Sequence, residues 1–199
     1  MVTSSLQTKV NTKARLLYYF PPPPPTTTVT KESSSFDDWC GWHTDHGSIT
    51  ALVPGHLFGE EEAGTPHNNN NNNNKYGDNS NNKNYKAGLY IQTRKETPET
   101  VHVKLPTTSL GFQVGETVEI MSGGKLRATP HAVRGNSPGR GGGGRASLAV
   151  FLQPEANQEL PPIVPQSSTD SRDGDASSLS ARWRSTFGEF QLATIQAFQ

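Results

Sequence analysis

The chain has 199 residues, and its 18 basic and 18 acidic side chains give a formal net charge of zero. This balance argues against a nucleic-acid partner and against a polybasic membrane contact, and no apolar run is long enough to span a bilayer. Hydrophobic residues make up only 31% of the chain, beside 19 glycines and 15 prolines. We therefore expect one compact domain of about 110–130 residues, with polar segments attached to it.

Cysteine usage and the start of the chain set two further expectations. The single cysteine, Cys40, excludes an intramolecular disulfide and is typical of a reducing compartment. We accordingly expect a cytoplasmic protein in which Cys40 is a small buried side chain rather than a reactive thiol. Residues 1–13 are expected to form a flexible N-terminus.

A core domain is predicted over residues 14–155. It opens with an apolar, aromatic strand over residues 15–20, which ends where five consecutive prolines begin. Two segments inside the domain lack the apolar side chains that a packed core needs: a Pro/Thr/Ser linker over residues 21–35 and an Asn-rich insertion over residues 59–86. We expect both segments to be disordered, the second as a long surface loop.

Short runs rich in β-branched and aromatic residues follow one another, separated by turns. They cover residues 48–53, 88–93, 100–105, 110–114, 117–121, 126–133 and 146–152. The second and third of these runs indicate a hairpin. A linker is predicted over residues 156–181 and a short helix over residues 182–199, with Thr186 and Glu189 as a capping box. Many short strands and almost no helix predict an all-β sandwich or jelly roll.

The residues with the clearest chemical meaning are two histidines and an aspartate. On a strand, His43 and Asp45 share a face and can bind one ion. A third ligand has to come from another strand, and His131 lies in a later strand-like run. Two imidazoles and one carboxylate suit a non-haem Fe(II) centre with open coordination positions, although an H-x-D pattern by itself also occurs by chance.

Arg145 and Ser147 form a second candidate pair, again two residues apart at the start of an apolar strand. A guanidinium binds a carboxylate through two parallel hydrogen bonds, and a serine hydroxyl can add a third. The other histidines are less informative. We interpret His46 as structural, since it would face away from Asp45, and His102 as a surface residue.

Several segments, taken in chain order, resemble motifs of the isopenicillin N synthase-like 2-oxoglutarate and Fe(II)-dependent dioxygenases. Trp42-His43-Thr44-Asp45-His46-Gly47-Ser48-Ile49-Thr50 resembles the family's H-x-D segment, and Gly111-Phe112-Gln113-Val114-Gly115-Glu116 its V-x-x-G-D/E pattern. Leu126-Arg127-Ala128-Thr129-Pro130-His131-Ala132-Val133 resembles the segment with the distal histidine, and Arg145-Ala146-Ser147 the R-x-S motif. Arg15-Leu16-Leu17-Tyr18-Tyr19-Phe20-Pro21 resembles the strand that precedes H-x-D.

The resemblance implies a double-stranded β-helix that oxidises a small organic molecule. His43, Asp45 and His131 would be the iron ligands, and Arg145 with Ser147 would bind the far carboxylate of 2-oxoglutarate. Dioxygen would be the co-substrate, ascorbate the reductant, and succinate and CO2 the co-products. Phe20 stands where the family often has a tyrosine that contacts the 2-oxo acid, and Tyr19 or Tyr18 could take that contact.

Two alternatives stay open at this point. Members of the family usually carry a long region before this core, so the chain could be a truncated, non-catalytic remnant that still binds a metal or a partner. It could also be an oxidase of the same family that needs no 2-oxoglutarate, because the substrate itself supplies the ligands.

Overall fold

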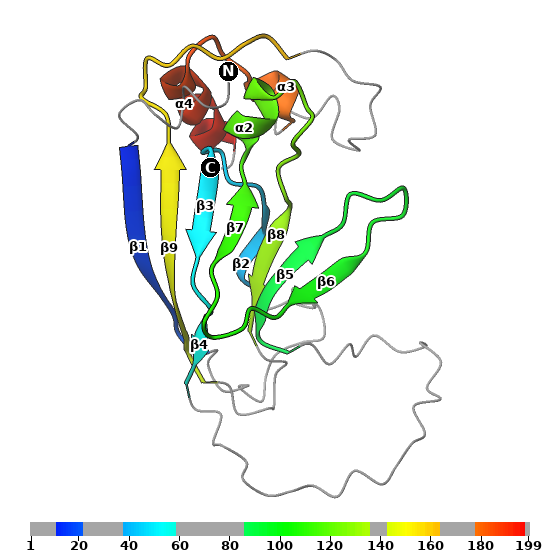
Figure 1. The fold of residues 1–199 in the computed structure, drawn as a ribbon, viewed down its shortest axis with the longest axis vertical. Helices are drawn as coiled ribbons and strands as arrows, with labels where there is room; N and C mark the ends of the chain where they lie inside the picture. The colour runs from blue at the N-terminus through cyan, green and yellow to red at the C-terminus, as the bar shows by residue number, and fades with distance from the viewer. Residues whose placement is uncertain (1–10, 22–37, 59–85, 136–142, 164–177, 198–199) are drawn as a thin grey trace, which may run out of the picture.

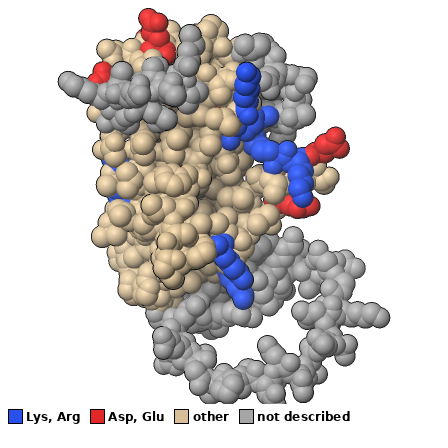
Figure 2. Space-filling model, in the orientation of Figure 1, with Lys and Arg blue, Asp and Glu red and all other residues tan. Residues whose placement is uncertain are grey.

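The computed structural model describes residues 11–21, 38–58, 86–135, 143–163 and 178–197. Nearly all of the Asn-rich insertion and of the Pro/Thr/Ser linker lie outside the described residues, so their predicted disorder stays a prediction. Among the helices of the described ranges, none is long and apolar enough to cross a membrane. On the face shown in Figure 2, most charged side chains lie along the right edge, where Lys and Arg stand beside Asp and Glu, and the middle of the face carries few charges.

Two antiparallel sheets pack against each other, with short helices at one end (Figure 1). The first sheet has the order β1-β9-β3-β7, with β4 also paired to β9; its strands are β1 (Asn11–Tyr19), β9 (Arg145–Gln153), β3 (Ile49–Leu52), β7 (Gly111–Val114) and β4 (His56–Leu57). The second has the order β2-β8-β5-β6, with strands β2 (Asp38–His43), β8 (His131–Arg134), β5 (Gly88–Gln92) and β6 (Thr100–Val103). This architecture confirms the predicted jelly roll, and β5 and β6 form the predicted hairpin.

The helices close one end of the sandwich (Figure 1). They are α2 (Glu116–Met121), α3 (Leu179–Arg182) and α4 (Phe187–Ala197). A cluster of buried apolar side chains joins α2 to α4, and it consists of Ile120, Leu160, Phe187 and Phe190. The Thr186 hydroxyl accepts a long 3.5 Å hydrogen bond from the Glu189 amide, as the predicted capping box requires at this end of α4.

The prediction of a strand over residues 117–121 is wrong, because this segment is α2. Its alternating apolar side chains mimic a strand, but Gly115 begins a helix whose first amides bond to the carbonyls of Asp45 and Gly47. Those bonds satisfy amides that a helix leaves unpaired at its N-terminus, and a local sequence pattern does not reveal them.

Three boundaries also differ from prediction. The strand expected over residues 126–133 begins only at His131, with Pro130 just before it. β1 begins at Asn11, inside the segment expected to be flexible, because all of its nine residues pair with β9. The helix predicted over residues 182–199 begins only at Phe187, whereas Arg182 ends α3, a short helix that otherwise lies in the predicted linker. The Ser178 hydroxyl caps α3 by accepting a hydrogen bond from the Ala181 amide.

Candidate metal centre

A cavity of about 530 Å³ lies between the two sheets. The first sheet contributes polar side chains to it, including Thr50, Gln113 and Ser147, and the second contributes His43 and His131. Much of the remaining wall is apolar, including Leu17, Leu52, Leu89, Val133 and Phe151. All six residues singled out from the sequence line this one cavity: His43, Asp45, His131, Arg145, Ser147 and Tyr19.

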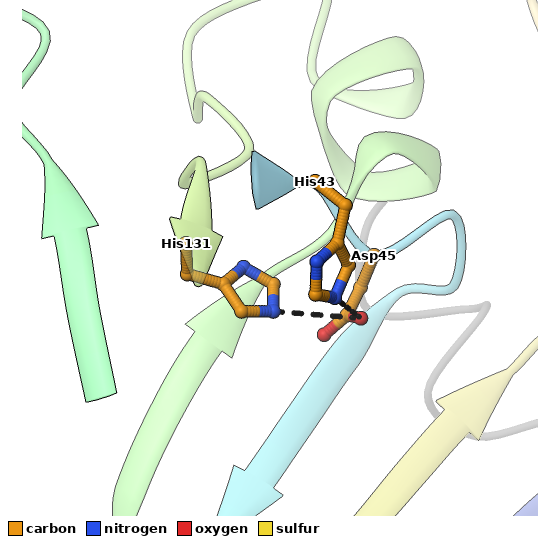
Figure 3. A group of neighbouring side chains, drawn as sticks. All are labelled: His43, Asp45 and His131. Carbon is orange, nitrogen blue, oxygen red and sulfur yellow. Dashed lines mark ion pairs between the residues drawn. The ribbon is translucent and has the colours of Figure 1, made fainter. Parts of the chain in front are cut away.

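Strand pairing brings the two histidines together. β2 and β8 are antiparallel neighbours, and His43 lies directly opposite His131 in their register. The two imidazole rings are tilted, with centroids 4.1 Å apart. Asp45 completes the group from the loop that follows β2, as Figure 3 shows. The expectation that His43 and Asp45 share one strand face is therefore wrong, since β2 ends at His43.

The histidine nitrogens that face the carboxylate are the Nε2 atoms. His43 Nε2 lies 4.0 Å and His131 Nε2 3.9 Å from Asp45 Oδ1 (Figure 3). Each Nδ1 atom instead approaches a backbone carbonyl, that of Gly41 at 2.7 Å and that of Thr129 at 2.9 Å. An imidazole that donates from Nδ1 presents the Nε2 lone pair, which is the arrangement that metal-binding histidines commonly adopt.

The donor set fits a divalent transition-metal ion. One ligand atom from each of the three residues lies within 4.8 Å of the others. Ligands at right angles around an ion at about 2.1 Å lie about 3 Å apart, so the three side chains need to close by roughly 1 Å. Two neutral imidazoles with one carboxylate are a typical non-haem Fe(II) set that leaves further positions open.

Two side chains orient the carboxylate of Asp45, and sequence reasoning missed the role of both. The Thr50 hydroxyl donates a 2.5 Å hydrogen bond to Asp45 Oδ2, and the Gln113 amide donates one of 3.2 Å to the same oxygen. Thr50 and Gln113 are directly opposite each other on β3 and β7. Oδ1 is thereby turned toward the histidines. The only available sequence signal was a polar residue within each apolar strand.

Gln113 also lies against His131, with its Nε2 2.6 Å from Nδ1 and 3.0 Å from Nε2 of the ring. His131 Nδ1 cannot both donate to the Thr129 carbonyl and accept from Gln113. We assign the proton on Nδ1 to the Thr129 bond, because the Thr129 carbonyl can only accept a hydrogen bond.

Burial and neighbouring charges push the two histidine pKa values apart. Burial lowers the pKa of His131, and the nearby charge of His43 lowers it further, while Asp45 opposes both. Burial also lowers the pKa of His43, but the Cys40 sulfur, the Gly41 carbonyl and Asp45 outweigh it and raise the value to about 9. His131 is therefore neutral near pH 7, whereas a proton on His43 must leave before an ion binds there.

Arg145 and Ser147 lie on β9, next to this group along the cavity wall. Arg145 is buried, and its Nη1 donates a 3.2 Å hydrogen bond to the Ser147 hydroxyl. Tyr19 pairs with Arg145 across β1 and β9, and its ring lies 5.7 Å from the Arg145 Cζ. A Cβ at Gly55 would collide with the guanidinium, so the Arg145 side chain packs directly against the backbone at Gly55. Burial lowers the pKa of Arg145, but a guanidinium stays charged in proteins.

Tyr19 is held as a neutral phenol. Burial and the Cys40 sulfur raise the pKa of Tyr19, while Arg145 opposes this effect. Its ring stacks on Trp39, with centroids 5.5 Å apart. Tyr19 therefore borders the cavity as a hydrogen-bond donor close to Arg145.

Of the remaining histidines singled out from the sequence, one has a structural role and the other lines the cavity. His46 does not line the cavity; Gln153 and Gln191 contact its Nε2 at 3.2 and 2.9 Å, as a structural role requires. His102, expected at the surface, instead lines the cavity and stacks on Tyr90 at 4.7 Å. Cys40 is partly buried, with its sulfur 3.6 Å from His43 Nδ1.

Comparison with known proteins shows the fold. No protein-family model matches the chain, and no curated protein matches it. Solved structures match over nearly its whole length. They include a full-length Neurospora crassa protein in complex with alpha-KG (15% identity, TM-score 0.55), where the match covers 95% of this chain and 45% of that one. A 2OG-Fe(II) oxygenase family protein from Caulobacter crescentus gives 22% identity and a TM-score of 0.53, with 94% of this chain and 46% of that one covered.

A dioxygenase for auxin oxidation from rice gives 18% identity and a TM-score of 0.53, with 94% of this chain and 47% of that chain covered. The chain therefore has the fold of these oxygenases, as the family resemblance implied. It spans about half the length of the solved structures it matches.

Proposed function

We propose that this protein is a 2-oxoglutarate- and Fe(II)-dependent dioxygenase that oxidises a small organic molecule. One observation carries the proposal: two Nε2 atoms and a carboxylate oxygen converge in a cavity that also contains a buried Arg–Ser pair. A metal site alone would suit many functions. The nearby fixed guanidinium adds a place for a carboxylate, and the fold is that of oxygenases of this class.

Each part of the cavity has a role in this proposal. His43, Asp45 and His131 would hold the ion, and Arg145 with Ser147 would hold the far carboxylate of 2-oxoglutarate. Tyr19 would donate a hydrogen bond to the same co-substrate. When bound, Fe(II) with 2-oxoglutarate and dioxygen would supply the oxidation of a C–H bond, with succinate and CO2 as co-products. Ascorbate would act as reductant only to keep the ion in the Fe(II) state.

The chain itself supplies the orientation of the candidate ligands and a largely apolar surrounding wall. Thr50 and Gln113 fix the carboxylate of Asp45 by hydrogen bonds to Oδ2, which leaves Oδ1 for the ion. The backbone carbonyls of Gly41 and Thr129 fix the two imidazoles. Apolar side chains over much of the cavity wall lower the local polarity, which strengthens the electrostatic contacts of the buried His131.

A succinate assay tests the proposal. Purified protein is incubated with Fe(II), ascorbate and 2-oxoglutarate, and succinate is measured with and without candidate substrates. Thymine and auxins belong in the first panel, because the Neurospora crassa protein is known in complex with thymine and the rice protein is an auxin dioxygenase. We expect succinate in wild-type reactions and none in His131→Ala. Absence of succinate with every substrate, or equal turnover in the variant, would refute the proposal.

One observation favours a second function. Because the chain spans about half the length of the structures it matches, it could bind metal and co-substrate without turning over a substrate. Anaerobic titration with Fe(II) and 2-oxoglutarate separates the two, since the chelate has a weak visible charge-transfer band. The band without succinate would favour the non-catalytic protein, and oxygen consumption without succinate would favour a 2-oxoglutarate-independent oxidase.

A further inference from the structure

The loop that carries Asp45 is held from outside the two sheets. β2 ends at His43 and β3 begins at Ile49, so the residues between them lie outside the strands. Several of their carbonyls bond instead to the start of α2. The Glu116 amide donates to the Asp45 carbonyl at 2.8 Å, and the Thr117 hydroxyl donates to the His46 carbonyl at 2.6 Å.

The approach of this loop to α2 is close. The Gly115 amide donates a 2.9 Å hydrogen bond to the Ser48 carbonyl, and a Cβ at Gly115 would collide with the Gly47 carbonyl oxygen. Only glycine fits that position without moving the loop. The position of Asp45 is therefore tied to the position of α2.

The side chain of Glu116 also contacts Thr44, the residue between the candidate ligands His43 and Asp45. The Thr44 hydroxyl donates a 2.6 Å hydrogen bond to Glu116 Oε1. Glu116 is only 3% exposed, so its negative charge needs a partner. Arg182 supplies it through two hydrogen bonds, from Nη1 to Oε2 at 2.8 Å and from Nη2 to Oε1 at 2.7 Å.

Arg182 connects this group to the C-terminal helices. It ends α3, is 2% exposed, and donates from Nη1 to the Thr194 hydroxyl of α4 at 2.8 Å. α4 reaches the same loop a second time, where Gln191 lies 2.9 Å from His46 Nε2 and the Phe187 ring stacks near the His46 ring. The helical segment thus holds the loop on both sides of Asp45.

We propose that Thr44, Glu116 and Arg182 are positioning residues for the candidate metal site, and that the C-terminal helices set its metal affinity through them. This inference rests on the proposed function, because it concerns the same site. A buried bidentate pair has one geometry, and the Thr44 bond passes that geometry to the backbone between His43 and Asp45. Partners one step removed from a metal ligand commonly change metal affinity by about 10- to 100-fold.

The test is Mn(II) binding by the full chain, followed through loss of the electron paramagnetic resonance signal of free Mn(II). Thr44→Val removes the hydroxyl while keeping the side-chain volume and the Glu116–Arg182 pair. We expect it to weaken Mn(II) binding about tenfold, while the lost hydrogen bond lowers the apo melting temperature by only a few degrees relative to the control. The control is Thr100→Val, at an exposed position where β6 begins in the second sheet.

Arg182→Gln provides a second arm, and we expect weaker Mn(II) binding together with a lower melting temperature. The double variant with Thr44→Val should weaken Mn(II) binding by less than the product of the two single fold-changes, because both substitutions act through Glu116. Unchanged affinity in Thr44→Val, or multiplicative effects in the double variant, would overturn the inference alone. Failure of the wild-type protein to bind Mn(II) would overturn the inference and the proposed metal site together. If Arg182→Gln does not fold, Thr44→Val decides the question.

Discussion

Replacing Arg145 with glutamine should weaken 2-oxoglutarate binding more than any other single change in the cavity wall outside the metal ligands. Each hydrogen bond from a guanidinium to a carboxylate contributes about 1.5–3 kcal/mol. Glutamine offers an uncharged amide in place of the two-pronged guanidinium, so the loss of binding free energy should be about 2–3 kcal/mol. This corresponds to roughly 30- to 150-fold weaker binding, at 1.4 kcal/mol for each factor of ten.

The structure explains why the effect should reach this size. Ser147, the Tyr19 ring and the backbone at Gly55 already fix the guanidinium, so little side-chain freedom is lost when a ligand binds. Because a Cβ at Gly55 would collide with the same guanidinium, Gly55→Ala should weaken 2-oxoglutarate binding in the same direction. That variant tests the position of Arg145 without removing its charge.

The assay is isothermal titration of 2-oxoglutarate into Mn(II)-loaded protein without oxygen. Arg15→Gln is the matched control, because Arg15 is an exposed arginine that lines another part of the same cavity. We expect the control to change the dissociation constant less than threefold, as about 0.6 kcal/mol or less is typical of an exposed charge. Equal losses in Arg145→Gln and Arg15→Gln would refute a specific clamp, and so would wild-type affinity in Arg145→Gln.

Three further predictions concern the metal site and the stability of the sandwich. His131→Ala should abolish measurable Mn(II) binding, since it removes a buried ligand; retained binding would place the ion elsewhere. Gly88→Ala should destabilise the fold by about 1–3 kcal/mol, because Gly88 has φ of 144° and its Cβ would lie 2.5 Å from His102 Nε2. Gly41→Ala, with no atom within 4 Å of the added Cβ, is the control in thermal melting. Finally, burial lowers the pKa of His102, so the unfolded chain takes up this proton more readily and stability should fall as the pH drops through about 6.5. His102→Gln should reduce that slope, although His46 and His131, whose pKa values are also lowered, keep part of it.

The strand pattern of this chain was largely readable from local sequence. Apolar alternation located the hairpin of β5 and β6 and the strands β3, β7 and β9, because side chains on a half-buried strand must alternate between faces. The same rule misassigned α2, where the apolar Val118 and Ile120 alternate with polar residues as in a strand. What made α2 a helix was the supply of loop carbonyls to its first amides, and those carbonyls lie about 70 residues away along the chain.

For the candidate site too, some features followed from the sequence and others only from the tertiary structure. The sequence determined which residues could hold a metal and a carboxylate, because few side chains supply these donors and their order along the chain resembled a known set. Tertiary structure decided their geometry. Cross-strand register placed His43 opposite His131, and the pairing of Thr50 with Gln113 turned the Asp45 carboxylate toward them.

Long-range contacts also decided which polar residues support the site. The sequence indicated only that Glu116 belongs to a turn motif and that Arg182 begins a C-terminal helix. It did not indicate that the two side chains pair. In the structure they form a buried ion pair beneath the Asp45 loop. Donor chemistry is a property of single residues and can be read along the chain, whereas the pairing of buried charges depends on which distant segments the fold brings together.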